Sequence, residues 1–128
     1  MKPESAKYVA QANILPGRAD VMLKAGLSED AARTTYLAAF HAAQAYIFER
    51  TDKAFKTHHG VQREFFRLTR NDARTDPGLR RFLSRSYEYK AAADYFAGPN
   101  PVTSAEDATE AVATAKRFVA EFTLLVPL

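Results

Sequence analysis

The chain contains no cysteine, which excludes a disulfide framework, a cysteine-ligated zinc site and a thiol nucleophile. It also lacks long apolar runs. The first residues alternate charge with short apolar stretches, unlike a signal peptide, and no later segment reaches the roughly 18 apolar residues that a membrane span needs. These absences predict a soluble protein of the reducing cytoplasm that does not enter a membrane.

The 128 residues of the chain have the length of one domain, and we expect residues 1–128 to form a single folded unit. A chain of this size buries roughly two-thirds of its surface on folding, so a core can form without covalent links. Internal repeats, low-complexity tracts and alternating strand patterns are absent from the sequence, and the apolar residues recur with a helical period. The predicted fold class is therefore all-α.

Proline, glycine and capping residues set the limits of the first two expected helices. A first helical region covers about 3–25, with a kink or break expected at Pro16, because proline has no amide hydrogen to donate. Gly26 is expected to end it in a left-handed conformation. Ser28 is then predicted to cap a second helix, which runs from about Glu29 to Glu49.

The second half of the chain contains start signals for three further helices. Thr57 precedes a short periodic segment, and Asp76 precedes Pro77, a pairing typical of a capped helix start. Thr103 and Glu106 have the spacing of a capping box, in which each side chain satisfies a free amide of the other residue. The three helices are expected at about 57–69, 77–96 and 104–125.

The basic excess of the chain is concentrated in its middle. Residues 50–90 contain 11 Lys or Arg and 5 Asp or Glu, a balance of +6, whereas the whole chain has a net charge of +3. A local positive potential of this kind attracts polyanions such as RNA, independent of the overall charge. A solvated helical surface rich in Arg and Lys explains the same charges.

Four arginines within this basic middle recur at spacings of four, three and four residues, which places them on one face if the third helix continues far enough. Such a stripe could bind phosphates, and neighbouring aromatic rings could stack on bases. Among those rings, Phe65, Phe66 and Phe82 are expected in the core, while Tyr87 and Tyr89 fit either role. The arginines are Arg63, Arg67, Arg70 and Arg74.

The chain has three histidines, His41, His58 and His59. His41 shares a broad face of the second helix with Arg33, and each is either a polar core group with a partner or a site residue. His58 and His59 fall in the first turn of the third helix, where free amides suit phosphate, although capping by Thr57 also explains them. Adjacent residues point about 100° apart on a helix, so no metal site is predicted.

Three motifs occur in order along the chain: an apolar stretch from Ala31 to Phe48 that contains Arg33 and His41, KTHHGV at 56–61, and YKAAADY at 89–95. Together they resemble the small stand-alone HEPN-domain proteins. The second helix of these proteins reads like RAYYAxFHAA and is followed by KTHKGV and by a helix ending in RxxADY. The resemblance spans about 23–122, most of the chain.

This resemblance implies an antiparallel up-and-down bundle of four to five helices. It also implies a homodimer that assembles through the side of the fourth helix, where Leu79, Phe82 and Leu83 are expected to contribute to the contact. Ribonucleases of the family carry an Arg-x4-6-His motif on that helix, and two copies meet across a dimer cleft to cleave RNA without a metal ion or another cofactor.

This sequence departs from the ribonuclease motif. Lys90 stands in place of the arginine and Tyr95 in place of the histidine, with Asp94 just before. Lysine lacks the bidentate fork of arginine, and a tyrosine with an ordinary pKa of about 10 is a poor base at pH 7. The catalytic residues, if there are any, are therefore expected to be these three, on a helix where Lys90 and Asp94 can also simply pair.

Two functions remain open on this basis. The first is a HEPN-domain protein of a toxin–antitoxin-type system with a minimal nucleotidyltransferase, which binds RNA or a nucleotide and has a degenerate ribonuclease site. The alternative is an active, metal-independent RNA endonuclease toxin.

Overall fold

The computed structural model describes residues 1–95 and 103–127. Within these ranges the chain forms helices and no strand, which confirms the all-α fold class. The predicted end of the fourth helix at Phe96 lies outside the described residues. The helices are α1 (Pro3–Lys24), α2 (Ser28–Thr51), α3 (His58–Thr69), α4 (Pro77–Tyr95) and α5 (Ala105–Leu124).

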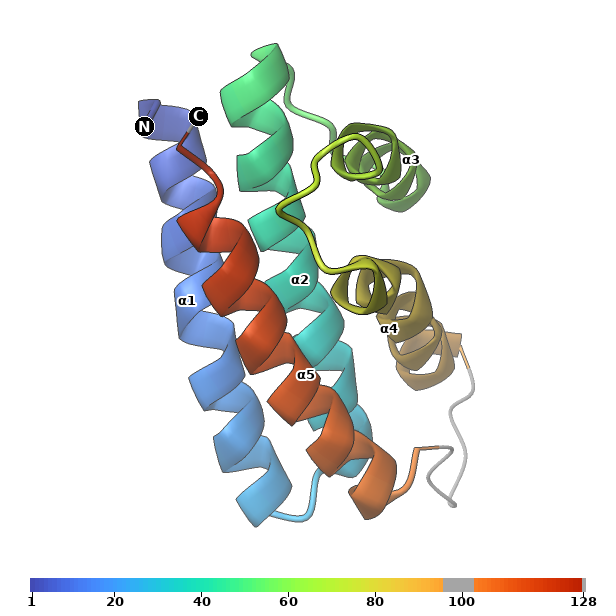
Figure 1. Cartoon of the computed structure of the whole chain (residues 1–128). Coiled ribbons are helices and arrows are strands. Elements are labelled where there is room, and N and C mark those ends of the chain that lie inside the picture. Colours follow the sequence, from blue (N-terminus) through green and yellow to red (C-terminus); the bar gives the residue numbers. More distant parts are fainter. Residues whose placement is uncertain (96–102, 128) are drawn as a thin grey trace.

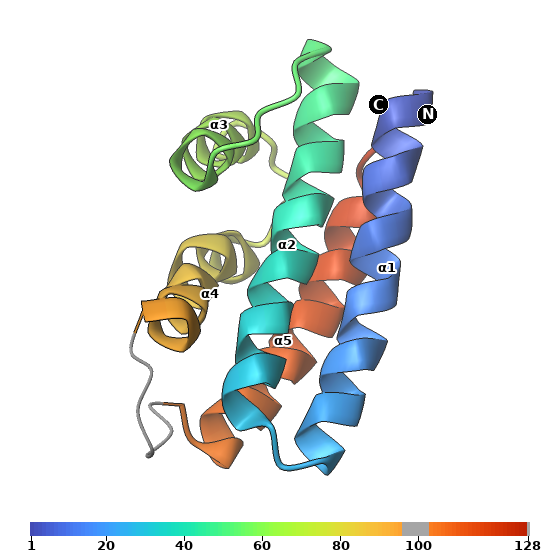
Figure 2. The same cartoon turned by 180° about the vertical axis from the view of Figure 1, so that it is seen from behind.

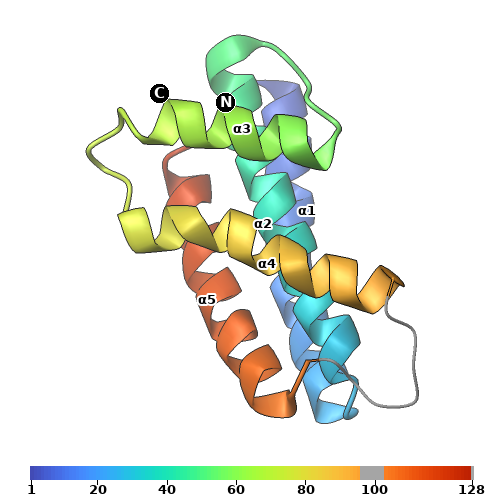
Figure 3. The same cartoon turned by 90° about the vertical axis from the view of Figure 1, so that its right-hand side faces the viewer.

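The three long helices α1, α2 and α5 lie side by side, with α1 antiparallel to the other two (Figure 1). The shorter helices α3 and α4 cross α2 on one side of this layer and run antiparallel to each other (Figure 3). The two ends of the described chain lie at the same end of the long helices (Figure 2). Helix α2 therefore contacts each of the other four helices.

The residues of α2 explain how one helix accommodates four neighbours. Its alanines, among them Ala38 and Ala42, are fully buried and allow the backbones of adjacent helices to approach closely. Large side chains such as Tyr36, Tyr46 and Ile47 fill the spaces that remain. Helix α5 adds the rings of Phe118 and Phe122 to the same core, and the centroids of these two rings are 4.5 Å apart.

The predicted break at Pro16 is wrong, because α1 continues through this residue to Lys24. Proline removes one hydrogen bond from the helix interior, but its ring is buried on the same face of α1 as Ala12 and Ala19. We infer that packing against α2 and α5 offsets the lost hydrogen bond. Tertiary contacts thus override the local helix-breaking tendency of proline.

Two of the expected helix caps are shifted by one residue. Ser28 is the first residue of α2 instead of its cap, because the amide of Ala31 already donates to the carbonyl of Leu27. Likewise, the capping box of Thr103 and Glu106 is wrong. The hydroxyl of Ser104 caps α5 by accepting from the amide of Asp107 at 3.0 Å.

The other start and stop signals are confirmed. Gly26 has a φ of +79° after α1, and the Asp76 carboxylate accepts from the amide of Gly78 at 2.7 Å at the start of α4. The hydroxyl of Thr57 caps α3 by accepting from the amide of Gly60 at 3.0 Å. A Cβ atom at Gly60 would meet this hydroxyl at 2.6 Å, so the cap requires glycine there.

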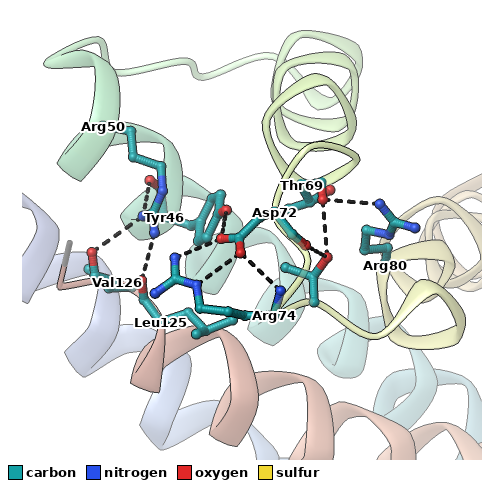
Figure 4. A network of polar contacts seen from close by, with 9 residues as sticks. Tyr46, Arg50, Thr69, Asp72, Arg74, Arg80, Leu125 and Val126 are labelled. Atoms are coloured by element: carbon teal, nitrogen blue, oxygen red, sulfur yellow. Dashed lines mark hydrogen bonds and ion pairs between the residues drawn. The ribbon is translucent and has the colours of Figure 1, made fainter.

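A polar network fixes the turn between α3 and α4 to the end of α2 (Figure 4). The Tyr46 hydroxyl donates to the Asp72 carboxylate at 2.8 Å, and the Arg74 guanidinium donates to both Asp72 oxygens at 2.9 and 2.7 Å. These bonds, led by those from Arg74, hold the pKa of Asp72 well below its usual range. Arg50 stacks 3.6 Å from the Tyr46 ring centroid and donates to the carbonyl of Leu125 at 2.8 Å.

We predict that Asp72→Asn lowers the free energy of unfolding at pH 7 by about 1–3 kcal/mol, because a charged acceptor shared by two donors is lost. The folded pKa of Asp72 lies below the unfolded value of about 3.9. Its contribution to stability is therefore complete above that value and disappears as the pH falls through the folded pKa. Urea unfolding at pH 7 and under acid conditions, followed by circular dichroism, measures both effects.

Glu64→Gln is the matched control, because it removes the same charge from an ion pair with Arg67 on the surface of α3. Pairs with such an exposed partner contribute less than about 1 kcal/mol. Equal losses of stability in the two variants would contradict a special role for the Asp72 network.

Candidate functional site

Three charged side chains meet where the C-terminal half of α4 crosses the start of α2. The Asp94 carboxylate accepts from Lys90 Nζ at 3.0 Å and from Arg33 Nε at 2.8 Å. Lys90 and Asp94 are four residues apart on α4 and share a face, whereas Arg33 comes from α2. We call Arg33, Lys90 and Asp94 the α4 cluster.

The α4 cluster carries a net charge of about +1, since two cations share one carboxylate. The hydrogen bond to Asp94 raises the pKa of Lys90, and the same bond, together with that from Arg33, lowers the pKa of Asp94. Lys90 and Asp94 are therefore both charged at pH 7. The side chain of Lys90 is only 12% exposed, so its ammonium group is held in place.

Tyr95, the residue after Asp94, lies at the edge of this cluster. Its ring centroid is 5.2 Å from Lys90 Nζ, within the range of a cation–π contact. The residue is 71% exposed, so the ring projects into solvent and is not an anchor for the end of the helix.

His58, at the start of α3, lies beside the α4 cluster. Its Nδ1 is 2.9 Å from the hydroxyl of Tyr36 on α2, and its ring centroid is 5.4 Å from that of Tyr87 on α4. Burial lowers the pKa of His58, and the charges of Lys90 and His59 lower it further. The imidazole is consequently neutral at pH 7. Burial also raises the pKa of Tyr36 to about 12, so its hydroxyl keeps its proton.

This arrangement combines an oriented ammonium group with a neutral imidazole. An ammonium group is a compact charge that binds phosphate, and a neutral imidazole can accept or donate a proton near pH 7. The structure therefore brings a histidine of α3 near Lys90 of α4, although α4 itself contains no histidine.

His41 lies apart from this site. It borders a groove between α1 and α2 that is lined also by Leu15 and Arg18, and its Nδ1 is 2.8 Å from the side-chain oxygen of Gln44. Its polar ring thus has a partner at the edge of the core. Arg33 faces α4, where it pairs with Asp94. Arg33 and His41 therefore do not belong to one site, although both lie on α2.

The four arginines do not form one stripe, because α3 ends at Thr69 and the condition that the third helix continues far enough is not met. Arg74 lies beyond the helix and binds Asp72, and Arg67 pairs with Glu64. In the described part of the chain, Arg63 and Arg70 form no ion pair. The basic surface of this region therefore depends on fewer arginines than the spacing suggests.

The aromatic residues divide differently from the sequence prediction. Phe65 and Phe82 are buried as expected, but Phe66 is 53% exposed, which corrects its assignment to the core. Phe82 and Leu83 are buried in the core of this chain, and Leu79 packs against the same core. Phe82 and Leu83 therefore serve mainly the core of this chain, and their contribution to a dimer contact stays a prediction.

Sequence reasoning missed the parts played by Tyr36 and Tyr87 in positioning His58. The ring of Tyr36 lies in the core, but its hydroxyl reaches His58. Tyr87 lies three residues before Lys90 on α4, and its ring contacts both histidines of α3. The i, i+3 spacing of Tyr87 and Lys90 was the available signal, since it places both on one face.

In residues 1–95 and 103–127, no group of three or more His, Cys, Asp or Glu side chains is placed to hold a metal ion. None of the helices in this part of the chain has the length and apolar character required to cross a membrane.

Comparison with known families identifies the chain. The family model described as HEPN domain matches residues 6–124, nearly the whole length. The chain therefore belongs to the HEPN domain family, which confirms the resemblance of its motifs and indicates a role connected with RNA or nuclease activity. A search of the curated proteins found no significant match.

The position of His58 beside the α4 cluster leads to a prediction for its pKa. Lys90→Met should raise the pKa of His58, because it removes a nearby positive charge, while Asp94→Asn should lower it, because it removes a nearby negative one. Imidazole titration by nuclear magnetic resonance measures the change. Lys116→Met is the matched control, since Lys116 on α5 pairs with Asp20 at 2.7 Å and should leave His58 unaffected. A His58 pKa that ignores Lys90 and Asp94 would separate this histidine from the cluster.

Proposed function

We propose that this HEPN-domain protein binds RNA or a nucleotide at the α4 cluster and that its ribonuclease site is degenerate. The observation that carries the proposal is the Lys90 ammonium, oriented by Asp94 on the same helix and flanked by Arg33 and His58 from two other helices. An oriented cation of this kind binds phosphate oxygens through charge-assisted hydrogen bonds.

The same geometry supports binding over strong catalysis. Lys90 offers one point charge where the family motif has the bidentate fork of arginine, and part of this charge is offset by Asp94. Arg33 uses only Nε for Asp94, so its terminal nitrogens have no partner in the part of the chain that the structure describes. A phosphate placed between Arg33 and Lys90 would contact both cations.

An active, metal-independent endoribonuclease remains the second candidate, and one observation favours it. His58 is a neutral imidazole beside Lys90, and it could take the role of the histidine that α4 lacks. In such an enzyme the imidazole would accept the proton of the ribose 2′-hydroxyl as that oxygen attacks the phosphorus, and the bond from the phosphorus to the 5′-oxygen of the next nucleotide would break. The departing 5′-oxygen would take a proton from the imidazolium or from water, while Lys90 would stabilise the charge on the phosphate.

We predict that the purified protein binds RNA but cleaves it weakly or not at all when incubated with total RNA in a chelator. Lys90→Ala should weaken binding several-fold, because a phosphate contact is lost. Lys116→Ala removes the same charge far from the cluster and should bind normally. Robust cleavage by the wild type that is lost in Lys90→Ala and Tyr95→Phe would establish the endonuclease instead.

The biological setting that we propose is a cytoplasmic toxin–antitoxin-type system in which a minimal nucleotidyltransferase is the partner. Support comes from the ordered motifs, which resemble stand-alone HEPN proteins of such pairs. A nucleotidyltransferase in the neighbouring reading frame would add to this support.

We also propose a homodimer that assembles through the outward face of α4. This face exposes Arg85 and Glu88, which carry opposite charges. Across a two-fold axis, an arginine of one copy can face a glutamate of the other, so the surface is complementary to itself. Light scattering should show a dimer for the wild type, a monomer for Glu88→Lys, and a restored dimer for Arg85→Glu combined with Glu88→Lys. A wild-type monomer at working concentration would contradict the dimer.

A further inference from the structure

A groove between α3 and α4 lies next to the histidines of the candidate site. It has a volume of about 400 Å³ and contains no carboxylate among its lining residues. It is lined by His59, Gln62, Arg63, Phe66 and Ser84. The groove therefore offers an aromatic ring, a guanidinium and hydrogen-bonding side chains in one place.

Phe66 is the unusual member of this set. Its neighbour Phe65 is buried, while Phe66 is 53% exposed on the outer surface of α3. Phe66 lies three residues after Arg63 and four before Arg70, so it shares a helix face with two arginines and not with the buried residues Val61 and Phe65. An exposed aromatic ring between cationic side chains is the arrangement that stacks on a nucleobase.

Arg63 differs from the next arginine of the same helix. Arg67 is bound to Glu64, whereas Arg63 has no ion-pair partner in the described ranges. Its guanidinium is exposed and lines the groove, so it can contact an anion without first losing a carboxylate. The Gln62 side chain adds a polar group to the same groove wall.

A series of ring contacts links the groove to the candidate phosphate site. His59 lines the groove, and its ring centroid is 5.9 Å from that of Tyr87. The Tyr87 ring in turn contacts His58, which feels the charge of Lys90. A chain of nucleotides that places one phosphate at the α4 cluster can therefore extend along Tyr87 and His59 to Phe66.

From these observations we infer that the groove is a base-binding subsite for single-stranded RNA, in which a nucleobase stacks on Phe66 and Arg63 contacts the adjoining phosphate. Single strands are required because the faces of paired bases are covered by their neighbours in a duplex. The inference rests on the proposed RNA binding at the α4 cluster and adds the form of RNA and the position of a base.

The test compares two labelled probes by fluorescence anisotropy: a single-stranded oligoadenylate, and an abasic strand of the same length. Phe66→Ala should bind the oligoadenylate about tenfold more weakly and the abasic strand like the wild type, because only a stacking contact is lost. Phe66→Tyr should restore binding, since its ring also stacks. Arg63→Gln should weaken both probes and reduce the salt dependence of binding, while the matched variant Arg67→Gln should do neither.

Several outcomes would overturn the subsite. Phe66→Ala could bind both probes like the wild type, which would indicate that the exposed ring contacts a protein partner instead of RNA. It could also lose affinity for both probes equally, which would exclude a contact specific to the base. It could also change the oligomeric state in light scattering, which would make Phe66 a contact between two copies. If Lys90→Ala still loses RNA binding in these cases, the proposed function stands and only the subsite fails. If the wild type binds neither probe, both proposals fail.

Discussion

The packing of four helices around α2 is the constraint on which the rest of the structure depends. A helix with neighbours on several sides must be buried around most of its circumference, so polar residues in it need partners within the protein. The Thr34 hydroxyl donates to the carbonyl of Asp30 at 2.8 Å, and the Gln44 amide donates to the carbonyl of Phe55 at 3.0 Å. With these groups satisfied, α2 can pack on all of these sides.

The crossing of α3 and α4 over α2 then creates the candidate site. These two helices lie across the long layer (Figure 3), and the ring of Tyr36 on α2 contacts both His58 at the start of α3 and Tyr87 in the second half of α4. The hydroxyl of Tyr36 on α2 orients His58 through a hydrogen bond, and Arg33 of the same helix donates a hydrogen bond to Asp94. The network around Asp72 fixes the turn that joins the two crossing helices, so the site depends on contacts at the other end of both helices.

Much of the fold could be predicted because helix ends follow local rules. Each confirmed helix end involves residues only a few positions apart, as in the Thr57 cap of α3, the Asp76 cap of α4 and Gly26 after α1. Predictions failed where distant packing decided the outcome. Pro16 remains inside a helix because its ring is buried, and Phe66 is exposed because α3 turns a different face to α2 and α5.

The sequence by itself determined the family, the helical segments and the pairing of Lys90 with Asp94, since these follow from motifs and from spacings within one helix. Only the tertiary structure decided that Arg33 binds Asp94, 61 positions away, and that His58 lies beside Lys90. It also decided which arginines form an ion pair. Arg74, for example, binds Asp72 within the turn that follows the end of α3. The physical reason is that spacing fixes neighbours on one helix, whereas contacts between helices depend on how their buried faces pack.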